Sequence, residues 1–116
     1  MDNKTEDKFV MYIFINIDLK MRTGKICAQV GHIVQMITEQ IVRDGYEKYP
    51  PSSEYFNYMK WRTNCTKVVL KATTEQLEKL LKMDGARHFI DDEKLTCVGF
   101  GPCLVTSNLA KDYSLL

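Results

Sequence analysis

The chain has 116 residues, of which 45% are hydrophobic and 27% are charged, and its formal net charge is +1. This length is enough to bury one hydrophobic core and too short for two ordinary domains, so we expect a single domain. The small net charge excludes binding to a polyanion through overall charge, and any such partner must meet a local basic patch.

The chain has no segment typical of a membrane or secreted protein. No apolar run reaches the roughly 18 residues of a membrane span, and the polar first residues do not resemble a signal peptide. We therefore expect a cytoplasmic protein without a membrane partner, with residues 1–8 as a flexible segment and residues 9–116 as the domain. Because there is no C-x-x-C pair, we expect reduced thiols in the core rather than metal ligands or disulfides at Cys27, Cys65, Cys97 and Cys103.

The first predicted elements are a strand and a long helix. Residues 9–17 form an almost unbroken apolar run, rich in aromatic and β-branched side chains and too short for a typical helix, which predicts a buried central strand. After residues 23–24, apolar side chains recur at helical spacing as far as residues 44–45. This pattern predicts an amphipathic helix.

A loop and a shorter helix follow. Residues 46–53 contain two consecutive prolines and predict a loop. Residues 54–61 predict a short helix with Tyr55, Tyr58 and Met59 facing inward.

The second half of the chain begins with another strand and helix pair. Residues 66–72 have the composition of a strand. Thr73, with Gln76 three residues later, makes a capping box that predicts a helix continuing to Gly85.

Two short strands are expected at residues 87–90 and 95–100, paired as a hairpin through the acidic turn at residues 91–93. After Gly101 and Pro102 the pattern weakens into a tail. Strands that alternate with crossing helices predict an α/β sheet covered on both faces, which makes three layers.

Ligands of such sheets lie beyond the carboxyl ends of the strands, which directs attention to the loops at residues 18–24 and 91–94. On the following helix, a narrow arc apart from the apolar stripe contains Lys25, Gln29, His32 and Met36. Lys25 lies in the first turn, where free N–H groups and the helix dipole favour an anion and disfavour a lysine. The residues alone leave two interpretations open: a site for a phosphate or an oxyanion, or an ordinary solvated lysine beside a structural histidine and turn aspartates.

The run at residues 18–32 closely resembles the signature D-L-x-M-x-x-G-K-x-x-A-Q-x-x-H of the archaeal and eukaryotic type of peptidyl-tRNA hydrolase. Later landmarks of that family follow in the same order at Trp61, residues 66–71, residues 98–102 and residues 115–116. The resemblance implies a mixed sheet of about four strands between helices, a homodimer, and no metal or organic cofactor.

The reaction implied is hydrolysis of the ester that joins a nascent peptide to the terminal ribose of tRNA. By this resemblance, Lys25 stabilises negative charge on the carbonyl oxygen or holds phosphate, and an aspartate after the third strand orients the water. Asp91 is the first choice for that aspartate and Asp92 the second. Side chains expected to contact the substrate are Gln29, His32, Lys20 and Arg22; further cations available for phosphate contacts are Lys60, Arg62, Lys67 and Lys71.

The chain departs from the family between the third and fourth strands. The family has a longer segment there, D-x-G-x-T-x-x-x-x-G-T or G-S, with a glycine and two hydroxyl residues that line the site. Here residues 91–94 run almost directly into the last strand, and Thr96 aligns with a strand residue; a less favoured alignment restores D-x-x-x-T from Asp92 to Thr96. Beside an active hydrolase, this leaves two hypotheses: a domain that binds tRNA or protein without turnover, and a purely structural dimer module.

Overall fold

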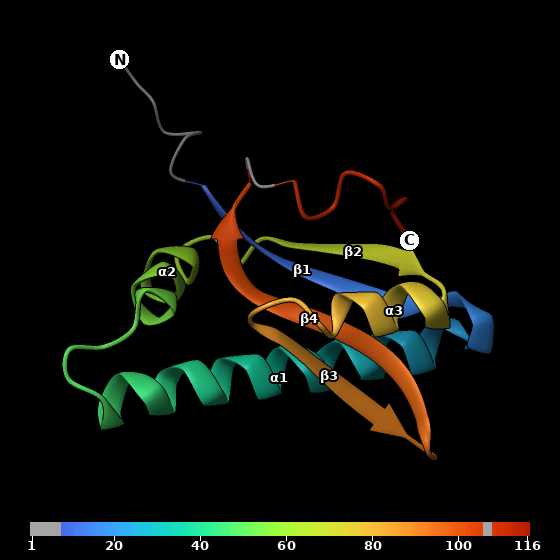
Figure 1. The fold of residues 1–116 in the computed structure, drawn as a ribbon, viewed down its shortest axis with the longest axis horizontal. Helices are drawn as coiled ribbons and strands as arrows, with labels where there is room; N and C mark the ends of the chain where they lie inside the picture. Colours follow the sequence, from blue (N-terminus) through green and yellow to red (C-terminus); the bar gives the residue numbers. More distant parts are fainter. Residues whose placement is uncertain (1–7, 106–107) are drawn as a thin grey trace.

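The computed structural model describes residues 8–105 and 108–116. In chain order, its elements are β1 (Phe9–Asn16), the 3₁₀ helix η2 (Ile17–Leu19), α1 (Thr23–Glu47), α2 (Ser53–Trp61), β2 (Lys67–Ala72), α3 (Thr74–Leu80), β3 (Ala86–Asp91) and β4 (Lys94–Leu104). The strands form one sheet in the order β2-β1-β4-β3, with β1 parallel to β2 and β4 antiparallel to both of its neighbours (Figure 1). The predicted α/β fold with a mixed four-stranded sheet is confirmed.

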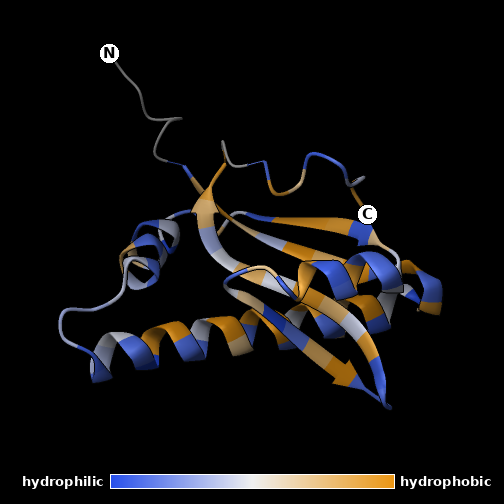
Figure 2. Ribbon diagram, in the orientation of Figure 1, coloured by the Kyte–Doolittle hydropathy of each residue, from blue (hydrophilic) through white to orange (hydrophobic). Residues whose placement is uncertain are grey.

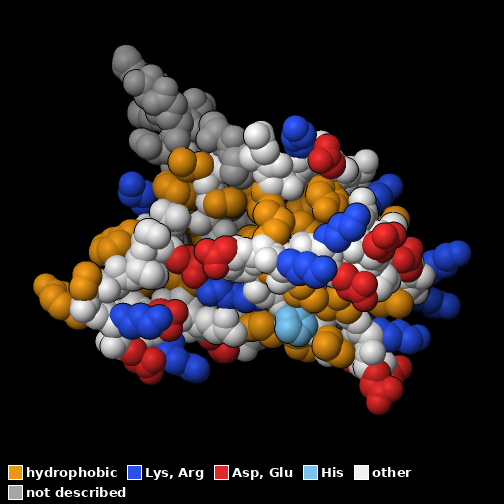
Figure 3. All heavy atoms as spheres, in the orientation of Figure 1, with side chains coloured by type: hydrophobic (Ala, Val, Ile, Leu, Met, Phe, Trp, Pro, Cys, Tyr) orange, Lys and Arg blue, Asp and Glu red, His pale blue; other side chains and the backbone are white. Residues whose placement is uncertain are grey.

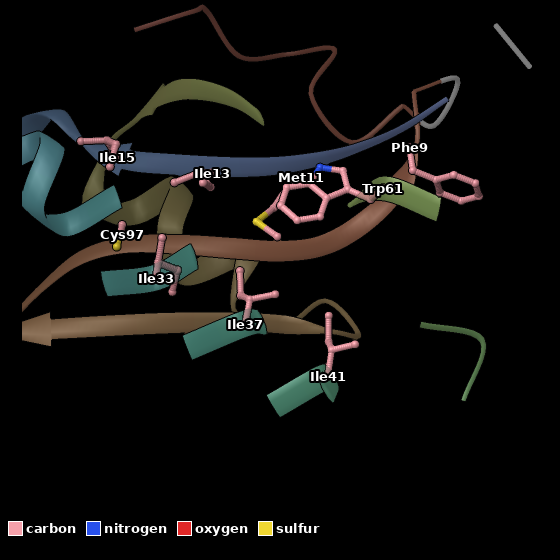
Figure 4. Packing of buried hydrophobic residues seen from close by; sticks show 9 residues of the cluster. All are labelled: Phe9, Met11, Ile13, Ile15, Ile33, Ile37, Ile41, Trp61 and Cys97. Carbon is pink, nitrogen blue, oxygen red and sulfur yellow. The ribbon is translucent and has the colours of Figure 1, made fainter. Parts of the chain in front are cut away.

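Strand β1 is buried along its whole length because helices cover both faces of the sheet. On one face, α1 packs Ile33, Ile37 and Ile41 against alternate side chains of β1, and Trp61 of α2 joins them (Figure 4). The remaining buried members of this cluster are Phe9, Met11, Ile13, Ile15 and Cys97. The hydropathy colouring shows the same apolar stripe along α1 (Figure 2).

The opposite face is covered by α3 and by the C-terminal segment. Leu77 and Leu80 of α3 pack against Val10, Tyr12 and Phe14, the other alternate residues of β1. The predicted three layers are therefore present, and the alternation of strand side chains divides the core into two clusters.

Close packing of α1 on β4 depends on Gly99. A Cβ atom built at this position would lie 2.9 Å from Cδ1 of Ile37 and 3.0 Å from Cγ1 of Ile33. The absence of a side chain at Gly99 therefore lets the helix approach the sheet closely, which fixes the position of α1 over the strands.

Two element boundaries differ most from the prediction, while the others agree within about three residues. Helix α3 ends at Leu80, and the chain reverses through exposed residues to Gly85, whose φ of +85° suits a glycine. Strand β4 continues beyond Phe100 to Leu104. The register between β1 and β4 shifts in this region, so that Gly101 and Pro102 lie opposite one β1 residue in a β-bulge, a place where a strand tolerates proline.

Some predicted burial is wrong. Tyr55 and Tyr58 pack partly against the core as expected, but Met59 is 37% exposed. The buried residue of this short helix is instead Trp61. Cys27 and Cys65 are also exposed rather than in the core. Cys27 lies outside the apolar stripe of α1, and Cys65 lies in the turn after α2.

The predicted flexible segment at residues 1–8 falls outside the described residues except for Lys8, and the predicted domain limits stay a prediction. Among the helices of the described ranges, none combines the length and the apolarity that crossing a membrane requires.

Strands β1, β2 and β3 run in the same direction, so their carboxyl ends meet at one edge of the sheet (Figure 1). Helix α1 begins at that edge, at the right-hand end of the view, beside the tip of β3. The two loops selected from the sequence are therefore neighbours.

Candidate functional site

Lys25 and Asp91 form an ion pair where α1 begins and β3 ends. The Nζ atom of Lys25 lies 2.7 Å from Oδ2 of Asp91, and the two side chains are 49% and 38% exposed, so a substrate can reach both. The expected proximity of Lys25 to the acidic turn is confirmed. Asp92 and Glu93 form the hairpin turn with φ angles of 54° and 62°, and Asp91 rather than Asp92 contacts the lysine.

The side chain of Asp91 is held by a buried amide, Gln29, which in turn contacts a buried hydroxyl, Thr96. Gln29, one turn after Lys25, donates from Nε2 to Oδ2 of Asp91 at 3.3 Å. The hydroxyl of Thr96 lies 2.7 Å from Oε1 of Gln29 and 3.1 Å from the carbonyl oxygen of Phe89. Both Gln29 and Thr96 are only 2% exposed, so their burial favours a positioning role over contact with a substrate.

A β-bulge aims Thr96 at Gln29. Phe89 pairs with Cys97 and Ile90 pairs with Leu95, so the register shifts by one residue and Thr96 is the extra residue of β4. Bulges turn a side chain away from its regular direction and are common beside active sites. Sequence reasoning missed this contact, because a threonine within a strand carries no local signal of a bulge.

The ion pair shifts both titrating groups toward their charged forms. The hydrogen bond and the charge of Asp91 raise the pKa of Lys25, and Asp92 adds a smaller effect in the same direction. The hydrogen bond and the charge of Lys25 lower the pKa of Asp91, with smaller contributions from Gln29 and His32. At neutral pH the centre therefore contains an ammonium and a carboxylate.

The first turn of α1 is exposed at the end of the sheet where the Lys25–Asp91 pair lies. Its N-cap residue, Arg22, makes no side-chain hydrogen bond that would cap the helix, so the N–H groups of Thr23, Gly24 and Lys25 are not capped by this side chain. A Cβ atom at Gly24 would meet nothing within 4 Å. These backbone donors and the helix dipole add to the attraction of Lys25 for an anion.

A second polar network holds the loop between β1 and α1. Nδ2 of Asn16 donates to Oγ1 of Thr74 at 2.9 Å and to the carbonyl oxygen of Leu95 at 2.8 Å. Oδ2 of Asp18 accepts a hydrogen bond at 2.9 Å from the backbone N–H of Thr74, in the first turn of α3. Asn16 is a further supporting residue that we did not select, although an amide that closes a long apolar run was a visible signal.

His32 continues the face of α1 beyond Gln29. Its ring stacks on Phe89 with 4.8 Å between the centroids and an interplanar angle of 28°. Lys20 and Arg22, which precede α1, are exposed at the same edge of the sheet. The structure thus places Lys20, Arg22 and Lys25 at the start of α1, and Asp91 and Asp92 at the tip of β3. Gln29 lies one turn along α1, and His32 lies one turn further, beside Phe89.

The remaining basic candidates divide into two groups. Lys71 lies near the carboxyl end of β2, on the side of the site. Lys67 begins that strand, and its ammonium lies 5.3 Å from the ring centroid of Trp61. Lys60 and Arg62 precede and follow Trp61 at the end of α2. These last three cations therefore lie toward the opposite edge of the sheet.

Cys97 neighbours the site but is not a suitable nucleophile. It is fully buried, and burial raises the pKa of its thiol to about 11, so it stays protonated at neutral pH. Within residues 8–105 and 108–116, no group of three or more His, Cys, Asp or Glu side chains is placed to hold a metal ion.

Comparison with known proteins gives one family. The model of the family described as peptidyl-tRNA hydrolase PTH2 matches residues 9–108. A search of curated proteins finds no match. The matched range contains the whole sheet, the three α-helices and all the residues of the site. The chain therefore belongs to the peptidyl-tRNA hydrolase PTH2 family.

Proposed function

We propose that this protein hydrolyses the ester bond of peptidyl-tRNA and releases a peptide and free tRNA. The observation that carries the proposal is the exposed Lys25–Asp91 pair at the open start of α1, with Gln29 and Thr96 buried beneath it. Membership of the peptidyl-tRNA hydrolase PTH2 family supports the same reaction.

In this proposal, Asp91 orients the attacking water. Its hydrogen bonds to Lys25 and Gln29 both use Oδ2, so Oδ1 is suited to accept a hydrogen bond from that water. The water oxygen bonds to the carbonyl carbon, the ester C–O bond breaks, and a proton passes to the 3′ oxygen of the ribose. Because its pKa is lowered, Asp91 is a weak base, and its main contribution is to hold the water in position.

Lys25 stabilises the charge that develops on the carbonyl oxygen. An ammonium has three donors, and one of them is directed to Asp91. The other donors, together with the N–H groups of the first turn of α1, can face an oxyanion. Lys20 and Arg22 contact phosphates of the acceptor end, and His32 contacts the substrate further along α1.

The test is release of the N-acetylated amino acid from purified N-acetylated aminoacyl-tRNA, a minimal substrate with the same ester bond. Lys25→Ala should lower kcat by roughly a hundredfold, the usual effect of losing one donor to an oxyanion. Lys48→Ala is the matched control, because Lys48 is exposed immediately after the same helix, at the end remote from the site. Equal activity of the two variants would show that Lys25 is not part of the reactive centre.

The turn between β3 and β4 favours a second candidate, a domain that binds tRNA or a protein partner without turnover. Only Asp92 and Glu93 separate the two strands, where the family carries its hydroxyl-bearing segment. Thr96 does not replace those hydroxyls at the surface, since it is 2% exposed. Saturable binding of peptidyl-tRNA with no release of peptide by the unmodified protein would support this candidate and reject the hydrolase.

A further inference from the structure

A groove leads away from the candidate centre along α1. It has a volume of about 370 Å³, and its walls include His32, Met36, Glu39 and Arg43 of α1 and Phe89 of β3. We propose that this groove binds the peptide part of the substrate, in an extended conformation, with its ester-linked end at Lys25. This inference rests on the proposed function and identifies where the acyl group lies.

The groove lies on the helix face that also carries the reactive centre. Lys25, Gln29, His32, Met36 and Arg43 follow one another at spacings of three, four or seven residues, so they lie along one face of the helix. The stacked rings of His32 and Phe89 form the end of the groove nearest the centre, since Phe89 precedes Asp91 by two residues. A chain attached to the reacting carbonyl and extended along this face therefore passes the His32–Phe89 stack before it reaches the groove.

The chemistry of the groove suits a peptide of varied sequence better than a nucleic acid. Its formal charges are one glutamate and one arginine, which cancel, whereas a polyanion requires an excess of cations. Gln35 donates from Nε2 to Glu39, and Gln40 accepts at Oε1 from Arg87. The other amide atoms, Oε1 of Gln35 and Nε2 of Gln40, can pair with peptide backbone. Met36 supplies a flexible apolar surface that adapts to different side chains.

The dimensions predict which residues of the peptide the groove holds. From Lys25 to His32, α1 rises about 10 Å, which an extended peptide covers with about three residues. From His32 to Arg43 the rise is about 16 Å, or about five further residues. The groove should therefore contact roughly the third to the eighth residue counted from the ester.

The experiment compares two substrates on each enzyme preparation: N-acetylated aminoacyl-tRNA and a peptidyl-tRNA with about eight residues. For the native protein, kcat/KM should be about tenfold higher for the longer substrate, the factor expected when one apolar side chain is buried. Met36→Glu should bring this ratio close to one. Because both substrates are measured on the same preparation, the ratio does not depend on the fraction of folded enzyme.

Met59→Glu is the matched control, since Met59 is an exposed helical methionine outside the groove, and it should keep the native ratio. A native ratio near one, or an unchanged ratio in Met36→Glu, would overturn the inference. Weaker binding of deacylated tRNA by Met36→Glu, equal to its loss for peptidyl-tRNA, would show that the groove holds nucleic acid instead.

Failure of the proposed function gives a different result. If neither substrate is turned over, the hydrolase is rejected, and the groove is tested by the Kd of the native protein for the same two substrates. Tighter binding of the longer one, lost in Met36→Glu, supports the groove. Equal Kd values reject it.

Discussion

Asp91 and Lys25 keep each other charged, and the direction of their pKa shifts predicts the pH dependence. The pKa of Asp91 is lowered from 3.8, so the carboxylate persists above that value and is lost only as the pH falls through the lowered pKa. The pKa of Lys25 is raised from 10.5, so its ammonium is fully present below that value and is lost as the pH rises through the raised pKa. The pair is therefore constant across the neutral range.

We expect no acidic limb from Asp91 in the pH profile of kcat/KM between about pH 5 and pH 8. Asp91→Asn should lower the activity across this whole range, because an amide cannot hold both the lysine and the water as a carboxylate does. Asp92→Asn is the control in the adjacent turn. A small loss in Asp91→Asn with a large loss in Asp92→Asn would assign the role to Asp92 and support the alignment that joins Asp92 to Thr96.

The hydroxyl of Thr96 acts through Gln29. Thr96→Val keeps the shape of the side chain but leaves Oε1 of Gln29 buried without this donor, at a cost of about 1–3 kcal/mol in the free energy of unfolding. Because Gln29 then orients Asp91 less well, kcat should fall while KM changes little. Thr96→Ser restores the hydroxyl and should recover kcat, whereas a purely structural role predicts lower stability with unchanged kcat.

Glycine substitutions in α1 can distinguish an effect on stability from an effect on activity. A Cβ atom added at Gly24 or at Gly31 would meet nothing within 4 Å beyond its chain neighbours and the backbone of its own helix, so alanine fits at both and should stabilise the helix by up to about 1 kcal/mol. Gly24 lies beside Lys25 in the first turn, where we propose that the oxyanion binds.

Gly24→Ala should therefore lower kcat/KM without lowering the melting temperature. Gly31→Ala, in the same helix, should keep the native activity. Peptide release and thermal unfolding, measured on both variants, check this prediction. The same activity in the two variants would exclude close approach of the substrate to the first turn of α1.

The formal net charge of +1 gives the chain no large overall excess of cations. The face in Figure 3 shows blue and red groups alternating across it, in agreement with the net charge of +1. Affinity for tRNA must then come from the few cations near the site. For three phosphate contacts, log K should fall with log salt with a slope of about −2 to −3.

Removal of individual cations tests which edge of the sheet binds tRNA. Lys20→Ala and Arg22→Ala should each reduce the magnitude of the slope by about one. Lys60→Ala and Lys67→Ala, at the opposite edge, should leave it unchanged. Binding titrations at several salt concentrations measure the slope, and affinity that is insensitive to salt would remove the phosphate-binding role of these residues.

Local sequence patterns were enough to predict the order and type of the main elements. The apolar run of β1, the periodic helix α1 and the capping box of Thr73 and Gln76 are such patterns, and the structure contains all three. The helical period also placed Lys25 and His32 on one face, because side-chain direction within a helix follows from residue spacing alone.

The contacts between elements, in contrast, follow only from the tertiary structure. Lys25 meets Asp91 rather than Asp92 because the hairpin keeps Asp91 within β3 and places Asp92 in its turn. Thr96 reaches Gln29 only through a bulge, and the groove beyond His32 exists because α1 crosses β3. These features depend on strand register and helix placement, which arise from packing between distant segments and leave no pattern in either segment by itself.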